Sequence, residues 1–193
     1  MKIQPLVEGH GEVEALPVLF RRLQEASGFF GLEVYKPVRV HRSELTHKAS
    51  LRQLIRRSLV QRECSGILVI FDGDDDCPKE LAPRIQAWGQ AEAGEIPCLV
   101  VIAHREYEAW LFSVLDPSLW PEHPETLRDA KSMIGKEYSP TRDQARLTAR
   151  FDLAATYRRC RSFRRMVRAF GLLAEGAGFP LSDWPPPSWT NAS

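Results

Sequence analysis

The most restrictive feature of the sequence is a pair of apolar runs that do not alternate with polar residues. Residues 66–71 read GILVIF and residues 96–103 read IPCLVVIA. A strand with one face in water alternates apolar and polar side chains, whereas a strand of a parallel sheet is covered on both faces and reads as a continuous apolar run. Both runs end abruptly in polar segments, DGDDD and HREYE. They therefore predict two central strands of a parallel sheet.

The segments around these runs alternate between strand and helix patterns. Further strands are predicted at residues 3–7, which are apolar, and at residues 33–41, where valines alternate with polar residues. Helical spacing of apolar residues predicts helices at residues 12–26, 49–62, 78–93 and 109–115. Such alternation is typical of an α/β protein with right-handed crossovers. We expect a mainly parallel four-stranded sheet flanked by helices.

The pattern divides the chain into three parts. Residues 1–115 contain the predicted α/β core, and residues 116–179 form an Arg-rich helical C-terminal extension packed on that core. Within the extension, helices are expected at about 139–150 and 162–173. Residues 180–193 contain four prolines and small polar residues, which predicts a loose tail.

The charge distribution is uneven although the net charge is only +1. Residues 1–138 carry 17 Lys and Arg against 21 Asp and Glu, whereas residues 139–170 carry nine Arg against two Asp. An acidic body with a basic block fits a protein that binds metal and a polyanion, and it equally fits charges that neutralise one another. Four scattered cysteines without a CxxC pair indicate reduced thiols. With no apolar run long enough for a membrane span, we expect a cytoplasmic protein.

Three of the four predicted strands end in carboxylates. Glu8 follows the first strand, and Glu106 follows the fourth. Asp72 and Asp74 follow the third strand, where Gly73 breaks it. In parallel sheets functional groups collect beyond the carboxyl ends of the strands, and Mg²⁺ prefers carboxylate oxygens together with water and phosphate. Because clustered acids repel one another unless a cation lies among them, Glu8, Asp72 and Asp74 are predicted ligands of Mg²⁺ or Mn²⁺.

Neighbouring acids are auxiliary candidates, and each motif also has a plainer interpretation. Asp76 is a further candidate ligand, and Glu12, Glu106 and Glu108 are candidates for a second ion. Alternatively, DGDDD is an ordinary solvated turn, Glu12 complements the dipole of its helix, and Glu106 and Glu108 are surface charges. The sequence leaves both interpretations open.

The order of these motifs resembles that of the Toprim domain, which topoisomerases, primases and OLD-family nucleases share. Val7-Glu8-Gly9 looks like the Glu-Gly motif at the end of the first Toprim strand, and Phe71-Asp72-Gly73-Asp74 looks like its Asp-x-Asp motif. The chain is most similar to a group of uncharacterised bacterial Toprim-like proteins with an EGxxE start, a DxDxDxP-like centre and an ExExW block. The last block is matched by Glu106-Tyr107-Glu108-Ala109-Trp110. The resemblance covers about residues 1–115.

By this resemblance, Glu8 takes an acid–base or metal-binding role, and Asp72 and Asp74 hold magnesium. The implied activity is that of a metal-dependent nuclease or phosphotransferase acting on DNA or RNA, with an ATPase partner in bacterial defence or repair. The arginines expected to hold the nucleic-acid backbone are Arg105, Arg142, Arg146 and Arg150, together with the arginines between residues 158 and 168.

Two other functions remain as alternatives. The first is a non-catalytic Toprim-like module that binds nucleic acid or an ATPase without cutting. The second is a HAD-type phosphatase, which also uses an Asp-x-Asp motif. HAD enzymes carry that motif on the first strand, whereas here it follows the third predicted strand and would leave Glu8 without a role.

Overall fold

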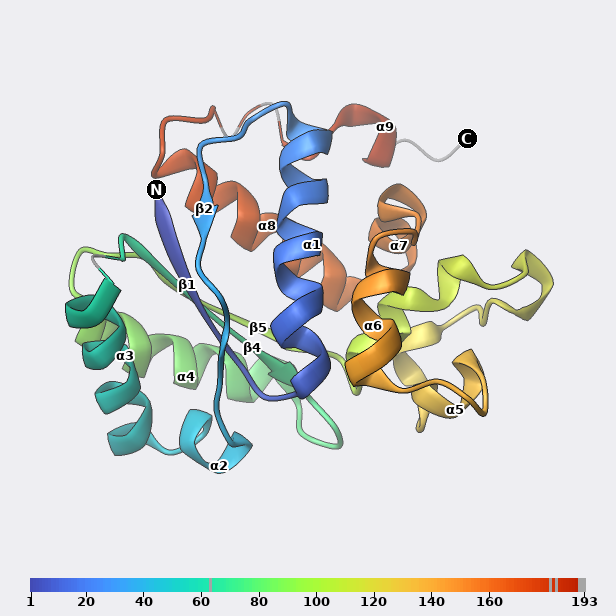
Figure 1. Ribbon diagram of the computed structural model, residues 1–193, viewed down its shortest axis with the longest axis horizontal. Helices are drawn as coiled ribbons and strands as arrows, with labels where there is room; N and C mark the ends of the chain where they lie inside the picture. The colour runs from blue at the N-terminus through green and yellow to red at the C-terminus, as the bar shows by residue number, and fades with distance from the viewer. Residues whose placement is uncertain (63, 181, 183, 191–193) are drawn as a thin grey trace.

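A computed structural model describes residues 1–62, 64–180, 182 and 184–190, and shows a parallel sheet between two layers of helices (Figure 1). The three long strands are β1 (Lys2–Val7), β4 (Gly66–Asp72) and β5 (Cys98–Ala103). They lie in the order β1-β4-β5 and pair in parallel. The predicted α/β class and mainly parallel sheet are confirmed.

The second predicted strand is divided in two. The strand expected at residues 33–41 consists of β2 (Glu33–Val34) and β3 (Val38–Arg39), which both pair in parallel with β1. Tyr35, Lys36 and Pro37 separate them, and Pro37 has no backbone N–H to donate to a neighbouring strand. The sheet therefore has five strands rather than four, with this interrupted pair at one edge.

Each face of the sheet carries its own hydrophobic layer. On one face, Val7, Ile70 and Ala103 pack with α1 (His10–Ser27) and α8 (Arg161–Glu175). The other face carries the alternate residues of the same strands, which pack with α3 (Lys48–Arg62) and α4 (Pro78–Ala93). Coverage on both faces is the reason that β4 and β5 have no polar alternation.

Two short elements next to the strand ends differ from the prediction. A four-residue helix, α2 (Arg42–Leu45), follows β3 and was not expected. The segment after β5 is a 3-10 helix, η1 (Tyr107–Val114), rather than the α-helix expected at 109–115. Both elements begin at the carboxyl edge of the sheet, so they determine which side chains reach that edge.

The region after residue 115 consists of short helices that pack against the α/β core. The elements are η2 (Pro117–Leu119), η3 (Pro124–Thr126), α5 (Ala130–Ile134), α6 (Pro140–Thr148), α7 (Leu153–Arg159) and α8. α6 and α8 correspond to the predicted helices, whereas α5 and α7 were not expected. α6 lies against α1 (Figure 1). None of the helices in the described part of the chain is both long and apolar enough to cross a membrane.

The proline-rich end of the chain is not the loose tail that its composition predicts. Trp184 and Trp189 are buried, each only 7% exposed, and both belong to the main hydrophobic core. The Trp184 Nε1–H donates a hydrogen bond to the Val167 carbonyl on α8 at 2.7 Å. A short helix, α9 (Pro187–Thr190), carries Trp189. The remaining tail positions, 181, 183 and 191–193, lie outside the described residues.

Candidate functional site

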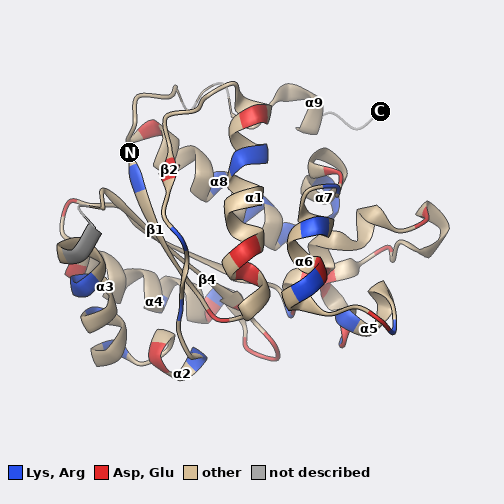
Figure 2. Ribbon diagram, in the orientation of Figure 1, with Lys and Arg blue, Asp and Glu red and all other residues tan. Residues whose placement is uncertain are grey.

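The acidic residues that follow the strands gather at one edge of the sheet. Because β1, β4 and β5 are parallel and in register, with Val7 opposite Ile70 and Asp72 opposite Ala103, their carboxyl ends lie side by side. Figure 2 shows acidic residues there in the first turns of α1 and in the loop after β4. This edge is where a doubly covered parallel sheet leaves room for a ligand.

The loop after β4 is held in a strained conformation. The Gly73 N–H donates to the Ala103 carbonyl at 2.8 Å, and the Asp74 N–H donates to the Arg105 carbonyl at 3.0 Å. A Cβ atom at Gly73 would lie 2.9 Å from the Ala103 oxygen, so only glycine fits without a shift. Asp74 (φ 48°) and Arg105 (φ 63°) both have left-handed backbones. Such strain in non-glycine residues concentrates at functional sites.

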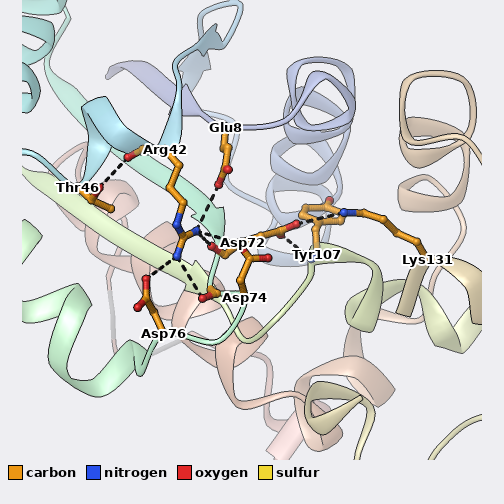
Figure 3. Close-up of polar contacts among 9 residues, drawn as sticks. Glu8, Arg42, Thr46, Asp72, Asp74, Asp76, Tyr107 and Lys131 are labelled. Atoms are coloured by element: carbon orange, nitrogen blue, oxygen red, sulfur yellow. Dashed lines mark hydrogen bonds and ion pairs between the residues drawn. The ribbon is translucent and has the colours of Figure 1, made fainter. Parts of the chain in front are cut away.

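The Arg42 side chain lies at the centre of this acidic edge (Figure 3). Its Nη1 is 3.5 Å from Glu8 Oε2 and 3.5 Å from Asp74 Oδ2, so these two carboxylate oxygens are at most twice that distance apart. Its Nη2 donates to Asp76 Oδ2 at 2.7 Å. The guanidinium also donates to the backbone carbonyl of Asp72. One cation therefore brings together three of the predicted acids: Glu8, Asp74 and Asp76.

Arg42 is a site residue that the sequence prediction missed. The prediction considered only carboxylates at strand ends, whereas the strand expected at 33–41 is followed by a basic residue, Arg42. Arg42 begins α2 directly after β3, which pairs in parallel with β1, so it reaches the same edge as Glu8. Its guanidinium also lies over the Phe71 ring, 5.2 Å from the ring centroid. Applying the strand-end rule to basic residues would have identified it.

The Asp72 carboxylate points away from Arg42 into a second, inner group of residues (Figure 3). Its Oδ1 accepts a hydrogen bond from the Tyr107 N–H at 2.8 Å, and its Oδ2 is 3.6 Å from Lys131 Nζ. Burial raises the pKa of Asp72 well above its usual value, and the nearby carboxylates of Glu12 and Glu108 raise it further. Asp72 is therefore paired with Lys131, whereas Glu8 and Asp74 are paired with Arg42.

Glu12 and Glu108 complete the inner group from α1 and η1. They are buried, at 6% and 1% exposure, so Glu108 is not the surface charge of the plainer interpretation. Glu12 lies in the first turn of α1, as its plainer interpretation requires. Glu108 Oε1 accepts a hydrogen bond from the Tyr138 hydroxyl at 2.9 Å. Burial raises the pKa of Glu108 to about 7. The Glu12 carboxylate folds over Gly9, where a Cβ atom would lie only 2.0 Å from Glu12 Oε2.

Three carboxylate oxygens at this edge are buried without a hydrogen bond. Among the described residues, Oε2 of Glu12 and Oε2 of Glu108 have no donor, and Oε2 of Glu8 has only the 3.5 Å ion pair with Arg42 Nη1. Buried polar atoms are nearly always hydrogen-bonded, so each exception requires an explanation, such as a bound ion. Glu12 connects the two groups electrostatically, because its charge raises the pKa of both Glu8 and Asp72. Burial is the largest cause of the raised pKa of Glu8.

The carboxylates are arranged around protein cations rather than around a preformed metal cage. Within the described ranges, no group of three or more His, Cys, Asp or Glu residues converges closely enough to hold a metal ion. The outer acids Glu8 and Asp74 share Arg42, and the inner acid Asp72 is paired with Lys131. Charge on the inner acids raises the pKa of Lys131, outweighing the opposite effect of burial. A divalent ion would have to displace or join these side chains.

The remaining predicted residues have structural partners. Glu106 Oε2 accepts a hydrogen bond from the Lys131 N–H at 3.1 Å, at the start of α5. Arg105 donates to Asp75 at 2.8 Å rather than reaching into the acidic edge.

The basic residues predicted on α6 are exposed, but two of them are engaged. Arg142 and Arg146 both bond to Asp143, at 2.7 and 3.1 Å, and hold the pKa of that carboxyl well below its usual range. Arg150 lies beyond the end of α6 and is exposed. The positive charge of this helix is thus partly neutralised by its own aspartate.

No family model, curated protein or solved structure matches this chain. The functional argument therefore depends on the chemistry of the acidic edge itself.

Proposed function

We propose that the acidic edge binds Mg²⁺ or Mn²⁺ and acts on nucleic-acid phosphodiesters, as a nuclease or related phosphotransferase. The observation that supports this proposal best is the pair of buried carboxylate oxygens without a donor on Glu12 and Glu108, next to Glu8, whose buried Oε2 has only an ion pair with Arg42 among the described residues. Carboxylate oxygens are the ligands that these ions prefer. Glu8 and Asp74 would hold an outer ion beside or in place of Arg42. An inner ion would have to draw together Asp72, Glu12 and Glu108, which do not converge on one point in the described structure.

The side chains present supply complementary chemistry. A bound divalent ion would polarise a phosphoryl oxygen and make bound water a stronger nucleophile. Arg42 presents a guanidinium whose planar donors match two phosphate oxygens, and three carboxylates hold it at the site. Glu108, with a pKa of about 7, can hold or release a proton near neutral pH. Lys131 favours the charged form of Asp72.

Metal binding can be tested directly by calorimetric titration with Mn²⁺. The wild-type protein is expected to bind Mn²⁺, and Asp74→Asn is expected to lower the affinity roughly 10- to 100-fold. Asp75→Asn is a matched control, because Asp75 lies in the same loop but pairs with Arg105 and Arg128 instead. Equal affinity of the Asp74→Asn variant and the wild type would remove Asp74 from the site.

Cleavage is tested with labelled single-stranded and duplex DNA and RNA in Mg²⁺, Mn²⁺ or EDTA. Products are expected only with a divalent ion, and only while Asp72 and Asp74 are intact. Cleavage that persists in Asp72→Asn and in Asp74→Asn would place the chemistry elsewhere. Because the resemblance implies an ATPase partner, the assay includes an arm with such an ATPase and ATP.

One observation favours the non-catalytic alternative. Arg42 lies between Glu8 and Asp74, where an outer ion would bind, and already neutralises them. In a binding module the guanidinium would replace the metal. Mn²⁺ titration of Arg42→Gln separates the two: a module gains Mn²⁺ binding that the wild type lacks, whereas an enzyme binds Mn²⁺ in both forms.

A further inference from the structure

Four arginines form a basic stripe along α8. Arg161, Arg164, Arg165 and Arg168 are spaced i, i+3, i+4 and i+7, so they share one helix face, while Phe163 and its apolar neighbours face the core. Arg164 donates to the backbone carbonyls of Tyr157 and Arg158. Within the part of the chain that the structure describes, none of the four forms an ion pair with an Asp or Glu side chain. They differ in this respect from Arg142 and Arg146.

Two depressions meet along this stripe. One, of about 260 Å³, lies between α4, the edge strand β5 and α8. The other, of about 590 Å³, lies between α7, α8 and the segment around Trp184. Arg161 and Arg165 line both depressions, so the two adjoin at these side chains, and we call them together the α8 trough.

The α8 trough combines positive charge with apolar surface. Lys79, Arg161 and Arg165 supply charge in the smaller depression, whose floor includes Val100 and Ile102. The acid in that lining is Glu125, whose oxygens accept hydrogen bonds from the backbone N–H groups of Arg161 and Ser162, at 2.6 and 2.7 Å.

In the larger depression, the partly exposed Tyr157 and the largely buried Trp184 line the wall beside the arginines. Cations beside apolar and aromatic surfaces are typical of sites for single-stranded nucleic acid, where phosphates meet the charge and unpaired bases stack.

The trough leads to the acidic edge. His104, which lines the smaller depression, directly follows β5. The next residue, Arg105, accepts a hydrogen bond from the Asp74 N–H through its carbonyl and pairs with Asp75 through its side chain. A polymer bound in the α8 trough would therefore contact His104, whose neighbour in sequence, Arg105, contacts Asp74 and Asp75 in the loop after β4.

We propose that the α8 trough binds the backbone of a single-stranded nucleic acid and directs it towards the acidic edge. This proposal rests on the proposed function only where it takes the bound single-stranded nucleic acid to be the substrate of the acidic edge. An acidic peptide would meet the arginines, but it has no flat groups to cover the apolar floor and aromatic wall. Duplex ends stay base-paired and cannot place bases in the depressions.

Binding is measured by fluorescence anisotropy in EDTA, so that no metal-dependent reaction contributes. The probe is a labelled oligothymidylate of about 16 nucleotides. In Arg161→Gln/Arg165→Gln/Arg168→Gln the affinity is expected to fall at least about tenfold, and the salt dependence to weaken by about two in slope, as expected for three lost phosphate contacts on a single strand. Asp74→Asn is expected to bind the probe like the wild type, which separates strand binding from metal chemistry.

The control removes three exposed arginines from one helix on the opposite layer, as Arg52→Gln/Arg56→Gln/Arg57→Gln on α3. It removes the same amount of charge, although Arg52 and Arg56 pair with Glu92, whereas the arginines of α8 have no such ion pair among the described residues. Unchanged affinity in the α8 variant, or an equal loss in the α3 control, would overturn the proposal. So would equal competition by oligoglutamate, which would indicate an acidic protein partner. If the α8 variant does not fold, Lys79→Gln serves instead, with an expected loss of about threefold and a flatter salt dependence; an unchanged affinity overturns the proposal.

Discussion

Arg42 shows how one side chain determines the state of the acidic edge. It contacts Glu8, Asp74 and Asp76 and donates to two backbone carbonyls of the loop after β4. Without it, carboxylates that lie close together would repel one another and their protonated forms would be favoured. Arg42 thus stabilises the loop conformation whether or not a divalent ion joins it.

Replacing Arg42 by alanine is expected to lower the free energy of unfolding by about 1 to 3 kcal/mol, because charged hydrogen bonds to the loop are lost. Urea unfolding without divalent ions measures this change. Arg21→Ala is the control, since Arg21 is exposed and pairs with Glu25 along the same helix; its effect is expected to stay within about 0.5 kcal/mol. Equal stability of Arg42→Ala and wild type would show that the guanidinium does not support the loop.

Glu108 makes the stability depend on pH. Burial raises its pKa from 4.5 to about 7, so between these values the folded protein binds a proton that the unfolded chain has released. The free energy of unfolding contributed by this group is therefore fully present below pH 4.5 and falls as the pH rises towards 7.

For the metal-free protein we expect a loss of roughly 1 to 3 kcal/mol from Glu108 between pH 4.5 and 8. Glu108→Gln should remove this contribution and flatten the profile, as followed by urea unfolding at a series of pH values. A profile that is identical in both proteins would mean that Glu108 titrates normally.

At the scale of elements, the turn after β4 determines where Asp74 lies relative to the end of the strand. Gly73 lets the chain pass close to Ala103 on β5, and the two N–H groups of Gly73 and Asp74 continue the pairing between β4 and β5 beyond the strands. This pairing fixes Asp74 beside Arg42. The position of Asp74 is therefore more restricted than it would be in a loop without these two hydrogen bonds.

Gly73→Ala is expected to cost about 1 to 3 kcal/mol, because the new Cβ must move the Ala103 carbonyl or the turn itself. The same shift should weaken Mn²⁺ binding, since Asp74 moves with the turn. Asp75→Ala, at an exposed position of the same loop, is the control for both measurements. Wild-type stability together with wild-type Mn²⁺ affinity in Gly73→Ala would contradict this role of the turn.

For the whole molecule, the C-terminal region forms part of the core and of the site. Phe163, Phe170 and Trp184 share one hydrophobic cluster with Ile3 and the rest of the β1 face. The same region supplies Lys131 to Asp72 and Tyr138 to Glu108. The α/β part alone, residues 1–115, would lack Lys131 and Tyr138, the two side-chain partners just named.

Trp184→Ala is therefore expected to destabilise the whole chain by about 3 to 5 kcal/mol in thermal or urea unfolding. Trp88→Ala is the comparison, because Trp88 on α4 is only half-buried and should cost less. A smaller effect for Trp184 than for Trp88 would show that the end of the chain contributes little to the core.

The sequence by itself determined the strands, their parallel arrangement and the edge at which Glu8, Asp72 and Asp74 emerge. These features follow from local patterns: continuous apolar runs indicate strands covered on both faces, and the ends of parallel strands share one edge. The bounds of α4 agree with the predicted 78–93, because the helical spacing of apolar residues is also a local pattern. The edge strand was predicted as one strand at 33–41, whereas the structure divides it into β2 and β3 around Pro37, which cannot donate a backbone hydrogen bond.

Only the tertiary structure decided the direction of each side chain and its partner. Asp72 and Asp74 are two residues apart, yet one turns to Lys131 and the other to Arg42. Lys131 on α5 and Tyr138 in the loop between α5 and α6 lie far along the chain from Asp72, and Trp184 packs against α8. Such contacts depend on packing between distant segments, whose geometry no local pattern encodes.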